Sequence, residues 1–190
     1  LSIINDILDI TKIEAGKLRV ISVEYDFSIV LKDVVNMISF KARVKGLEFR
    51  VLLDENIPRR MMGDDIRLRQ ILVNLLNNAV KYTHKGRVTL EITRRQSEEG
   101  VAKLFFQVKD TGIGIKEEDL QKLCQPFERI EEKRNRNIEG TGLGMSITKQ
   151  LLGLLNSELK VVSVYGEGSE FSFELTQEIV DDSPIGRLED

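Results

Sequence analysis

The chain has 190 residues, of which 41% are hydrophobic and 31% charged, a composition that fits one folded domain with at most a short appendage. Its 28 basic and 31 acidic residues give a net charge of −3, and this near balance argues against a dedicated nucleic-acid binder. One cysteine and one histidine exclude an internal disulfide framework, a cysteine-rich zinc site and any site built on paired imidazoles of this chain. No apolar run approaches the roughly 20 residues that span a bilayer. Because the chain begins with Leu1, we expect it to be a piece of a longer protein.

Residues 1–16 predict an amphipathic helix that Gly16 ends. A helix of this length is marginal in water, so its apolar side should pack against other protein. Two interpretations remain open: the helix packs on its own domain, or it is the end of a coiled-coil or bundle helix whose partners lie outside this chain. The apolar residues of that side are Leu1, Ile3, Ile4, Ile7, Leu8, Ile10 and Ile13.

The next part of the chain alternates between short strands and longer helices. The apolar pattern predicts a strand at 18–24, a helix at 27–45 that Gly46 ends, and a strand at 47–54. A second strong helix is expected at 64–82.

The second half begins with a hairpin-like strand pair at 87–96 and 101–110. Further expected elements are a short helix at 117–123, a helix that begins at 140–144 and runs to about 156, and strands at 158–165 and 169–176. This is an α+β pattern, with several antiparallel strands in one sheet covered by three helices. Residues 179–190 are acidic and poor in apolar side chains, which predicts a linker or frayed terminus.

The helix at 64–82 has an unusual polar side. Its apolar side should meet the sheet, and the residues that fall within an arc of roughly 80° on the other side are Arg67, Gln70, Asn74, Asn78 and Lys81. A solvated helix face favours Glu, Lys and Arg, because Asn competes with the helical backbone and lowers helix propensity. An amide oxygen can contact a magnesium ion that carries phosphates, and a lysine supplies a point charge for phosphate. The alternative is a merely solvated face.

A glycine loop follows the strand at 101–110, with the sequence Asp110-Thr111-Gly112-Ile113-Gly114-Ile115. Its glycines allow a tight turn and the close approach of a planar ligand. Asp110 can accept a hydrogen bond from an exocyclic amine such as that of adenine. An ordinary turn is the alternative, since Asp-Thr-Gly also begins turns without ligands.

A second loop, Gly140-Thr141-Gly142-Leu143-Gly144, leads directly into a helix, where free backbone N–H groups form an anion cradle. Its spacing is neither that of a Rossmann fingerprint nor that of a Walker A loop. Between the loops, residues 128–139 carry four acids and four bases with few apolar anchors, which predicts a mobile lid. Gly166 and Gly168, taken alone, are typical of a plain hairpin turn.

These segments together resemble the catalytic and ATP-binding domain of sensor histidine kinases over nearly the whole chain. RQILVNLLNNAVKYT resembles the family's N box, DTGIGI and GTGLGMSI its two glycine boxes, QPF its F box and GEGSEFSF its closing glycine motif. INDILDITKIEAGKL resembles the end of the second helix of the dimerisation and phosphoacceptor domain.

The resemblance implies a two-layer α/β sandwich, a mixed and mostly antiparallel sheet covered by three helices. This Bergerat-type ATP-binding fold is shared by gyrase, the heat-shock chaperone ATPases, histidine kinases and MutL. It also implies three parts: residues 1–16 as the end of the dimerisation helix, 17–177 as the catalytic ATP-binding domain, and 178–190 as a C-terminal linker.

The resemblance further implies a role for each matching residue. Asn78 would bind Mg2+, and Asn74 and Lys81 would act in catalysis, with Asn74 supporting the phosphate region. Asp110 would contact the adenine amine. The other residues implied in ATP binding are Tyr82, Gly112, Gly114, Ile115, Phe127 as the lid anchor, Gly140, Thr141, Gly142, Leu143, Gly144, and Ser169 near Asp110.

Asn74 stands where the hydrolytic branches of this superfamily place a glutamate that activates water as a general base. An amide takes no proton at neutral pH, so the residue favours transfer of the phosphoryl group to a protein histidine over hydrolysis. The alternatives are an ATP-hydrolysing conformational switch and a non-catalytic nucleotide-binding or interaction module. The phosphoacceptor histidine would lie on the upstream helix, before Leu1.

The resemblance implies ATP and ADP as ligands, and an upstream phosphoacceptor domain and a response regulator receiver domain as partners. It also implies a homodimeric parent and a cytoplasmic domain, whose parent could be anchored in the inner or plasma membrane. The single histidine, His84, follows the polar helix without an adjacent carboxylate. The helix dipole favours a histidine there without any chemistry. The single cysteine, Cys124, is expected to pack near the base of the lid rather than to react.

Overall fold

The computed structural model describes residues 2–126 and 142–187, and within them it contains one mixed sheet of seven strands. The strand order is β1-β3-β7-β5-β4-β2, and β6 pairs with β7 beside this path. β2 and β4 are parallel, whereas the other pairs are antiparallel. The strands are β1 (Val23–Asp26), β2 (Glu48–Leu53), β3 (Pro58–Gly63), β4 (Arg87–Arg95), β5 (Val101–Asp110), β6 (Lys160–Val164) and β7 (Gly168–Pro184).

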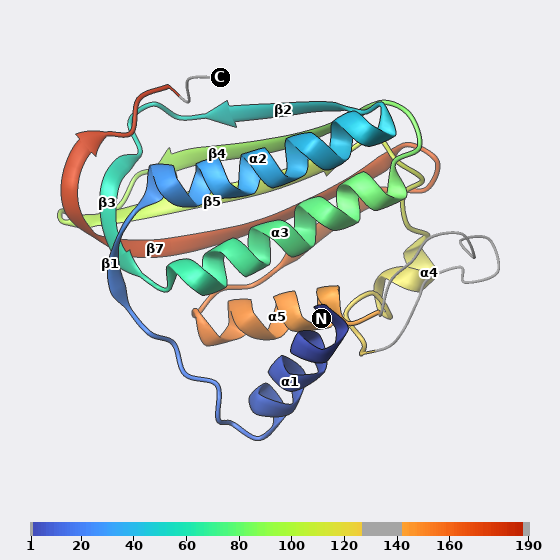
Figure 1. Cartoon of the computed structure of the whole chain (residues 1–190), viewed down its shortest axis with the longest axis horizontal. Helices are drawn as coiled ribbons and strands as arrows, with labels where there is room; N and C mark the ends of the chain where they lie inside the picture. The colour runs from blue at the N-terminus through green and yellow to red at the C-terminus, as the bar shows by residue number, and fades with distance from the viewer. Residues whose placement is uncertain (1, 127–141, 188–190) are drawn as a thin grey trace.

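Three long helices, α2, α3 and α5, lie side by side over one face of the sheet (Figure 1). This arrangement confirms the expected α+β class and two-layer architecture. None of the helices in the described part of the chain is both long and apolar enough to cross a bilayer. The helices are α1 (Ser2–Glu14), α2 (Phe27–Lys45), α3 (Asp65–Tyr82), α4 (Glu117–Leu120) and α5 (Gly144–Leu154).

The core lies between the helices and one face of the sheet. Alternate side chains of β5 are fully buried there, as the period of two along a strand requires. Phe106 stacks on Phe173 of β7 at 4.7 Å and meets Phe27 of α2 edge-on at 6.2 Å. On the opposite face, Lys109 lies 3.8 Å from carboxylate oxygens of both Glu91 and Glu170, and Arg95 lies 3.8 Å from the centre of the Phe105 ring, so that face carries charged side chains.

Local signals in the sequence explain where α2 and α3 begin and end. The Asp26 and Asp64 side chains accept hydrogen bonds from backbone N–H groups in the first turns of α2 and α3. Gly46 ends α2 with a φ of 73°, a conformation that suits glycine. The ammonium of Lys45 donates to the carbonyls of Val80 and Lys81, both at 2.7 Å, and thereby satisfies the C-terminal end of α3.

Three expectations about strands are corrected. The strand expected at 18–24 is β1, Val23–Asp26, which pairs with β3. β3 was not predicted from the sequence, because Pro58–Gly63 shows no alternation of apolar and polar residues. The segment 179–190 was expected to be a linker, yet β7 continues to Pro184 and pairs with β3. Ile179 is half-buried and pairs with Met61, so this acidic segment is a strand with one side facing the core.

Candidate functional site

Asp110, at the end of β5, lies at one end of the candidate site. Its Oδ1 accepts a hydrogen bond of 2.9 Å from the Gly112 N–H, and it is the β-sheet partner of Ser169 in β7. Burial raises the pKa of Asp110 to about 6, although hydrogen bonds from the backbone N–H groups of Gly112 and Ser169 act in the opposite direction. The structure therefore brings Asp110, Gly112 and Ser169 together, as expected, around a carboxylate that is partly shielded from water.

Backbone atoms crowd around this carboxylate so closely that three positions have room only for glycine. A Cβ added at Gly112 would lie 2.4 Å from the Tyr82 carbonyl oxygen, and one at Gly114 would lie 2.2 Å from that of Val164. At Gly168, a Cβ would lie 2.0 Å from the Asp110 carbonyl oxygen, and the φ of 137° also favours glycine. The Gly166–Gly168 pair, which alone suggests a plain turn, thus packs against the glycine loop.

Ser163 of β6 joins this end of the site, and the sequence analysis missed it. Its hydroxyl accepts from the Ile115 N–H at 2.8 Å, donates to the Gly168 carbonyl at 3.0 Å and lies 2.8 Å from the Ser169 hydroxyl. One side chain thereby connects the glycine loop to the turn before β7. The strand ELKVVSVY gave no signal for this role, because a lone serine in a strand is common.

The C-terminal half of α3 forms the floor between the two glycine loops. Its last residue, Tyr82, accepts a hydrogen bond of 3.2 Å from the Ile113 N–H, and the Lys81 ammonium lies 5.1 Å from the centre of the Tyr82 ring. Asn78 is half-buried, and its side chain makes no hydrogen bond to any residue that the structure describes. Asn77 instead accepts from Lys41 of α2 at 2.7 Å, so only part of the asparagine cluster belongs to the site.

The other end of the site is the start of α5. The Asn74 amide nitrogen lies 3.3 Å from the Thr148 hydroxyl and 3.4 Å from the Gly144 carbonyl oxygen. The side chain of Leu143, the N-cap of α5, makes no hydrogen bond to the first turn of the helix. The N–H groups at the N-terminus of a helix are a favourable place for an anion. Of the remaining loop residues, Gly142 has a φ of 74°.

Three of the expected residues, Phe127, Gly140 and Thr141, lie outside the described residues, as does the expected lid at 128–139. The described part of the site runs along α3 from Asn74 to Tyr82, about 12 Å at 1.5 Å per residue. The half-buried Asp110 carboxylate, flanked by glycines, lies at one end of this length, and the N-terminus of α5 lies at the other.

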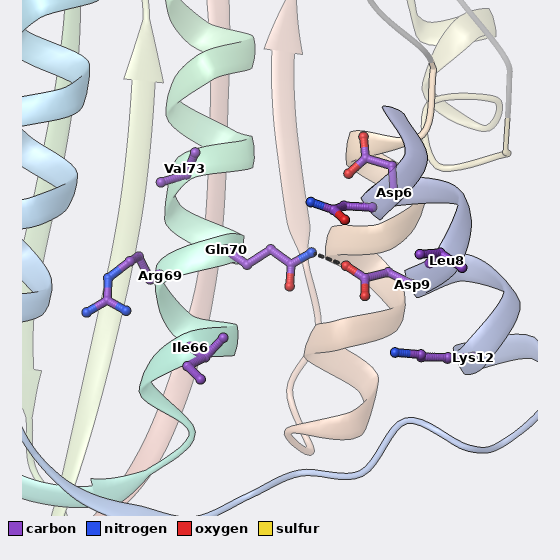
Figure 2. A pocket seen from close by; sticks show the side chains of 9 residues that line it. Asp6, Leu8, Asp9, Lys12, Ile66, Arg69, Gln70 and Val73 are labelled. Carbon is purple, nitrogen blue, oxygen red and sulfur yellow. Dashed lines mark hydrogen bonds between the residues drawn. The ribbon is translucent and has the colours of Figure 1, made fainter. Parts of the chain in front are cut away.

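A separate groove of about 460 Å³ lies between α1 and the N-terminal half of α3 (Figure 2). The Gln70 amide donates to Asp9 at 2.8 Å across it, so this part of the polar side of α3 holds α1. Ile10 of α1 is buried, whereas Ile7 and Leu8 are about half exposed. The helix therefore packs on its own domain along one side and leaves apolar side chains uncovered along another.

Neither His84 nor Cys124 belongs to the site. His84 is exposed, one residue beyond the C-cap of α3. Cys124 is half-buried against the core, and its burial raises the pKa of the thiol, which disfavours the reactive thiolate.

Comparison with known proteins gives a family match over most of the chain. The family model described as histidine kinase-, DNA gyrase B-, and HSP90-like ATPase matches residues 63–179. Hybrid signal transduction histidine kinase B of Dictyostelium discoideum is 41% identical over 91% of this chain and 9% of its own length. Sensor protein GacS of Pseudomonas syringae is 40% identical over 90% of this chain and 19% of its length. BarA of Escherichia coli is 35% identical over 94% of this chain and 20% of its own length.

The chain thus spans about a tenth to a fifth of the length of these curated relatives. Among solved structures, full-length ShkA in complex with AMPPNP superposes with a TM-score of 0.78 and 28% identity, over 95% of this chain and 36% of ShkA. The histidine kinase AdeS of Acinetobacter baumannii, at 20% identity, shares the fold with a TM-score of 0.69 over 94% of this chain and 77% of AdeS.

Proposed function

Because this chain belongs to the family of histidine kinase-, DNA gyrase B- and HSP90-like ATPases, we propose that it transfers the γ-phosphoryl group of ATP to a histidine. The relatives named above are sensor histidine kinases, and that resemblance favours a kinase over the hydrolytic branches. The observation that carries the proposal is the half-buried Asp110 carboxylate between glycines whose backbones leave no space for a Cβ.

Adenine fits the Asp110 end of the site for two physical reasons. A flat ring can approach a backbone that carries no side chains at Gly112 and Gly114, and its exocyclic amine can donate to the Asp110 carboxylate. In a site screened from water such a hydrogen bond to an ionised acceptor is stronger than a neutral one. Ser163 and Ser169 hold the loop in place from behind.

The phosphates fit the other end, where the N–H groups of the first turn of α5 attract negative charge. Asn78 presents an amide without a partner among the described residues, a neutral oxygen ligand of the kind that Mg2+ accepts. Magnesium bound there would offset the negative charge of the phosphates. Lys81, one turn further along α3, contributes a positive charge near the same groups.

Asn74 favours transfer of the γ-phosphoryl group to a histidine over hydrolysis of ATP. The nucleophile is an imidazole nitrogen of the acceptor, which bonds to the γ-phosphorus as the bond to the β–γ bridging oxygen breaks and ADP leaves. A carboxylate at position 74 would take a proton from water, whereas an amide cannot. The phosphoryl group is therefore kept for the protein nucleophile, and catalysis rests on positioning and charge.

The surrounding protein belongs to the same proposal. Residues 1–16 are the end of a dimerisation and phosphoacceptor helix. The catalytic domain begins at residue 17 and extends to Pro184, where β7 ends, and the last residues are a C-terminal linker. The partners are the upstream phosphoacceptor domain of a homodimeric parent and a receiver domain, with no nucleic acid. We also propose that the domain lies in the cytoplasm, whether or not the parent is anchored in a membrane.

The test is a transfer assay with γ-labelled ATP, Mg2+ and the phosphoacceptor domain added as a separate chain. We expect acid-labile label on the acceptor histidine, none on the 190-residue chain, and little phosphate release without acceptor. Asn78→Ala should weaken Mg2+–ATP binding, measured by calorimetry. Asn77→Ala is the matched control, because the neighbouring asparagine bonds Lys41 away from the site.

Three results would contradict the proposal. Stable label on His84 would place the acceptor within this chain. Rapid ATP hydrolysis that the acceptor does not alter would favour the conformational-switch alternative, and absence of ATP binding would favour a non-catalytic module.

A further inference from the structure

A closed set of hydrogen bonds joins α3 to the first turn of α5. Thr148 is fully buried, and its hydroxyl donates to the Gly144 carbonyl oxygen at 2.8 Å. The Asn74 amide nitrogen reaches that same carbonyl at 3.4 Å and the Thr148 hydroxyl at 3.3 Å. Gly144 is the last residue of the second glycine loop and the first residue of α5, so the contact is made at the phosphate end of the site.

The chemistry of these atoms fixes the orientation of the Asn74 side chain. A backbone carbonyl oxygen only accepts hydrogen bonds, and the Thr148 hydroxyl has used its one proton on Gly144. Both neighbours are therefore acceptors for Asn74, and only its nitrogen can face them. The amide oxygen remains on the side away from α5, free of these contacts.

We propose that Thr148 is a positioning residue for phosphoryl transfer. Its hydroxyl holds the Asn74 amide in one orientation and ties the phosphate-binding turn of α5 to the helix that carries Asn78. The inference rests on the proposed function, because it concerns the same phosphate end. It adds a residue that neither the sequence analysis nor the family resemblance assigned.

The same contact also limits whether a glutamate at position 74 could convert the kinase into an ATPase. A glutamate there has no proton to donate at neutral pH, and its carboxylate would face the Gly144 carbonyl and the Thr148 oxygen. Asn74→Glu should therefore displace the start of α5 and lose ATP binding rather than produce an efficient ATPase. The Gly144 carbonyl and the Thr148 hydroxyl on α5 therefore favour an amide over a carboxylate at position 74.

The test compares two ligands, ATP with Mg2+ and adenosine, on single variants of the whole chain. Thr148→Val keeps the shape and removes the hydroxyl. We expect its ATP affinity to fall about tenfold, the effect of one lost hydrogen bond of about 1.4 kcal/mol. Its adenosine affinity should stay unchanged, because adenosine uses only the Asp110 end. Thr148→Ser keeps the hydroxyl and should restore ATP affinity to within about threefold, which reports on the contact even where Thr148→Val folds poorly.

Ser157→Ala is the matched control. The Ser157 hydroxyl also donates to a backbone carbonyl, that of Glu174, but it lies beyond the C-terminal end of α5 and away from the phosphate end. Its removal should leave both affinities unchanged. In an Asn74→Ala background, Thr148→Val should have no further effect on ATP binding, because the contact is already lost.

The outcomes separate the two proposals. If the chain binds ATP and Thr148→Val binds it equally well, the positioning role is wrong and the proposed function stands. If Thr148→Val loses ATP and adenosine to the same extent, the hydroxyl serves only the general fold, and the inference is again wrong. If the unmodified chain binds no ATP, the proposed function and the inference both fail.

Discussion

At the Asp110 end of the site, neighbouring elements meet through backbone atoms that leave no space for a Cβ, whereas at the Asn74 end two helices meet through side chains. The first end combines the close contacts of three glycines with hydrogen bonds of Ser163 at 2.8 and 3.0 Å. The second end depends on amide contacts of 3.3 and 3.4 Å, near the upper limit for hydrogen bonds.

The difference indicates a division of labour between the two ends. Backbone packing against a sheet is hard to displace, so the base-binding end should keep its shape with or without a nucleotide. Long side-chain contacts between helices are easily changed, so the phosphate end should tighten when phosphates arrive. Catalytic hydrogen bonds are often long before the substrate binds. Four variants or conditions test this contrast at the Asp110 end.

Gly168→Ala should have the largest effect. The added Cβ meets the Asp110 carbonyl oxygen at 2.0 Å in a backbone conformation that alanine rarely adopts. We expect a loss of about 2–4 kcal/mol in the free energy of unfolding and more than a hundredfold loss of adenosine affinity. Chemical denaturation and calorimetry measure the two quantities.

Gly153→Ala is the control for this substitution. Gly153 lies within α5 with nothing within 4 Å of an added Cβ, so alanine should stabilise the chain by about 0.5–1 kcal/mol. Normal adenosine binding by Gly168→Ala would show that the base-binding end is less rigid than its spacing indicates.

Asp110→Asn should have the second largest effect on adenosine affinity. It replaces the ionised acceptor by a neutral amide, and we expect adenosine affinity to fall about 10- to 100-fold, as for other hydrogen bonds to charged groups. Asp54→Asn is a suitable control, because the Asp54 carboxylate accepts backbone hydrogen bonds from Asn56 and Arg94 outside the site. That variant should lose stability but keep its affinity for adenosine.

The pH dependence of adenosine binding tests the same carboxylate without a mutation. The pKa of Asp110 is about 6, so below that pH the native carboxyl gains a proton and accepts the amine poorly. At pH 5 we expect about tenfold weaker binding than at pH 7. Adenosine is the ligand of choice, because phosphates titrate near the same pH. Asp110→Asn should bind independently of pH in this range.

The stability of the ligand-free chain should change with pH in the opposite direction. Because the folded pKa of Asp110 is above the ordinary value of 3.8, the folded chain holds more protons than the unfolded chain between about pH 4 and 6. The contribution of Asp110 to stability therefore falls as pH rises through this window and is constant above it.

Ser163→Ala should have the smallest effect. It removes the acceptor of the Ile115 N–H and the donor to Gly168, so we expect a loss of about 1–2 kcal/mol in stability. Adenosine affinity should fall only a few-fold, because the backbone packing remains. Ser157→Ala, which removes a hydroxyl that bonds the Glu174 carbonyl, should cost stability without changing affinity.

The sequence predicts the Asp110 end better than the Asn74 end for a physical reason. Asp110 and the glycines of its loop are neighbours in the chain, and the strand pair that carries them has a clear alternation. Thr148 instead bonds Asn74, which lies 74 positions away in the sequence, and Ser163 bonds Ile115, which lies 48 positions away. Such contacts depend on how elements pack, and a threonine in a helix or a serine in a strand gives no local signal.

The fold follows the same rule. The bounds of α2 and α3 could be predicted, because Asp caps, Gly46 and the apolar period are local. β3 and the second half of β7 could not, because neither shows a clear alternation, and both depend on pairing with strands that are distant in the sequence. The helical wheel of α3 grouped Gln70 with Asn74, whereas packing assigns Gln70 to α1.

The length of β7 determines how other proteins can be attached to this one. Gly168 touches Asp110, whereas Pro184 pairs with Pro58 at the other end of the strand. Seventeen residues of strand extend at most about 55 Å at 3.3 Å each. A fluorescent reporter fused after residue 187 would start far from the nucleotide. A fused acceptor would need a tether of roughly 15 extended residues to return to it.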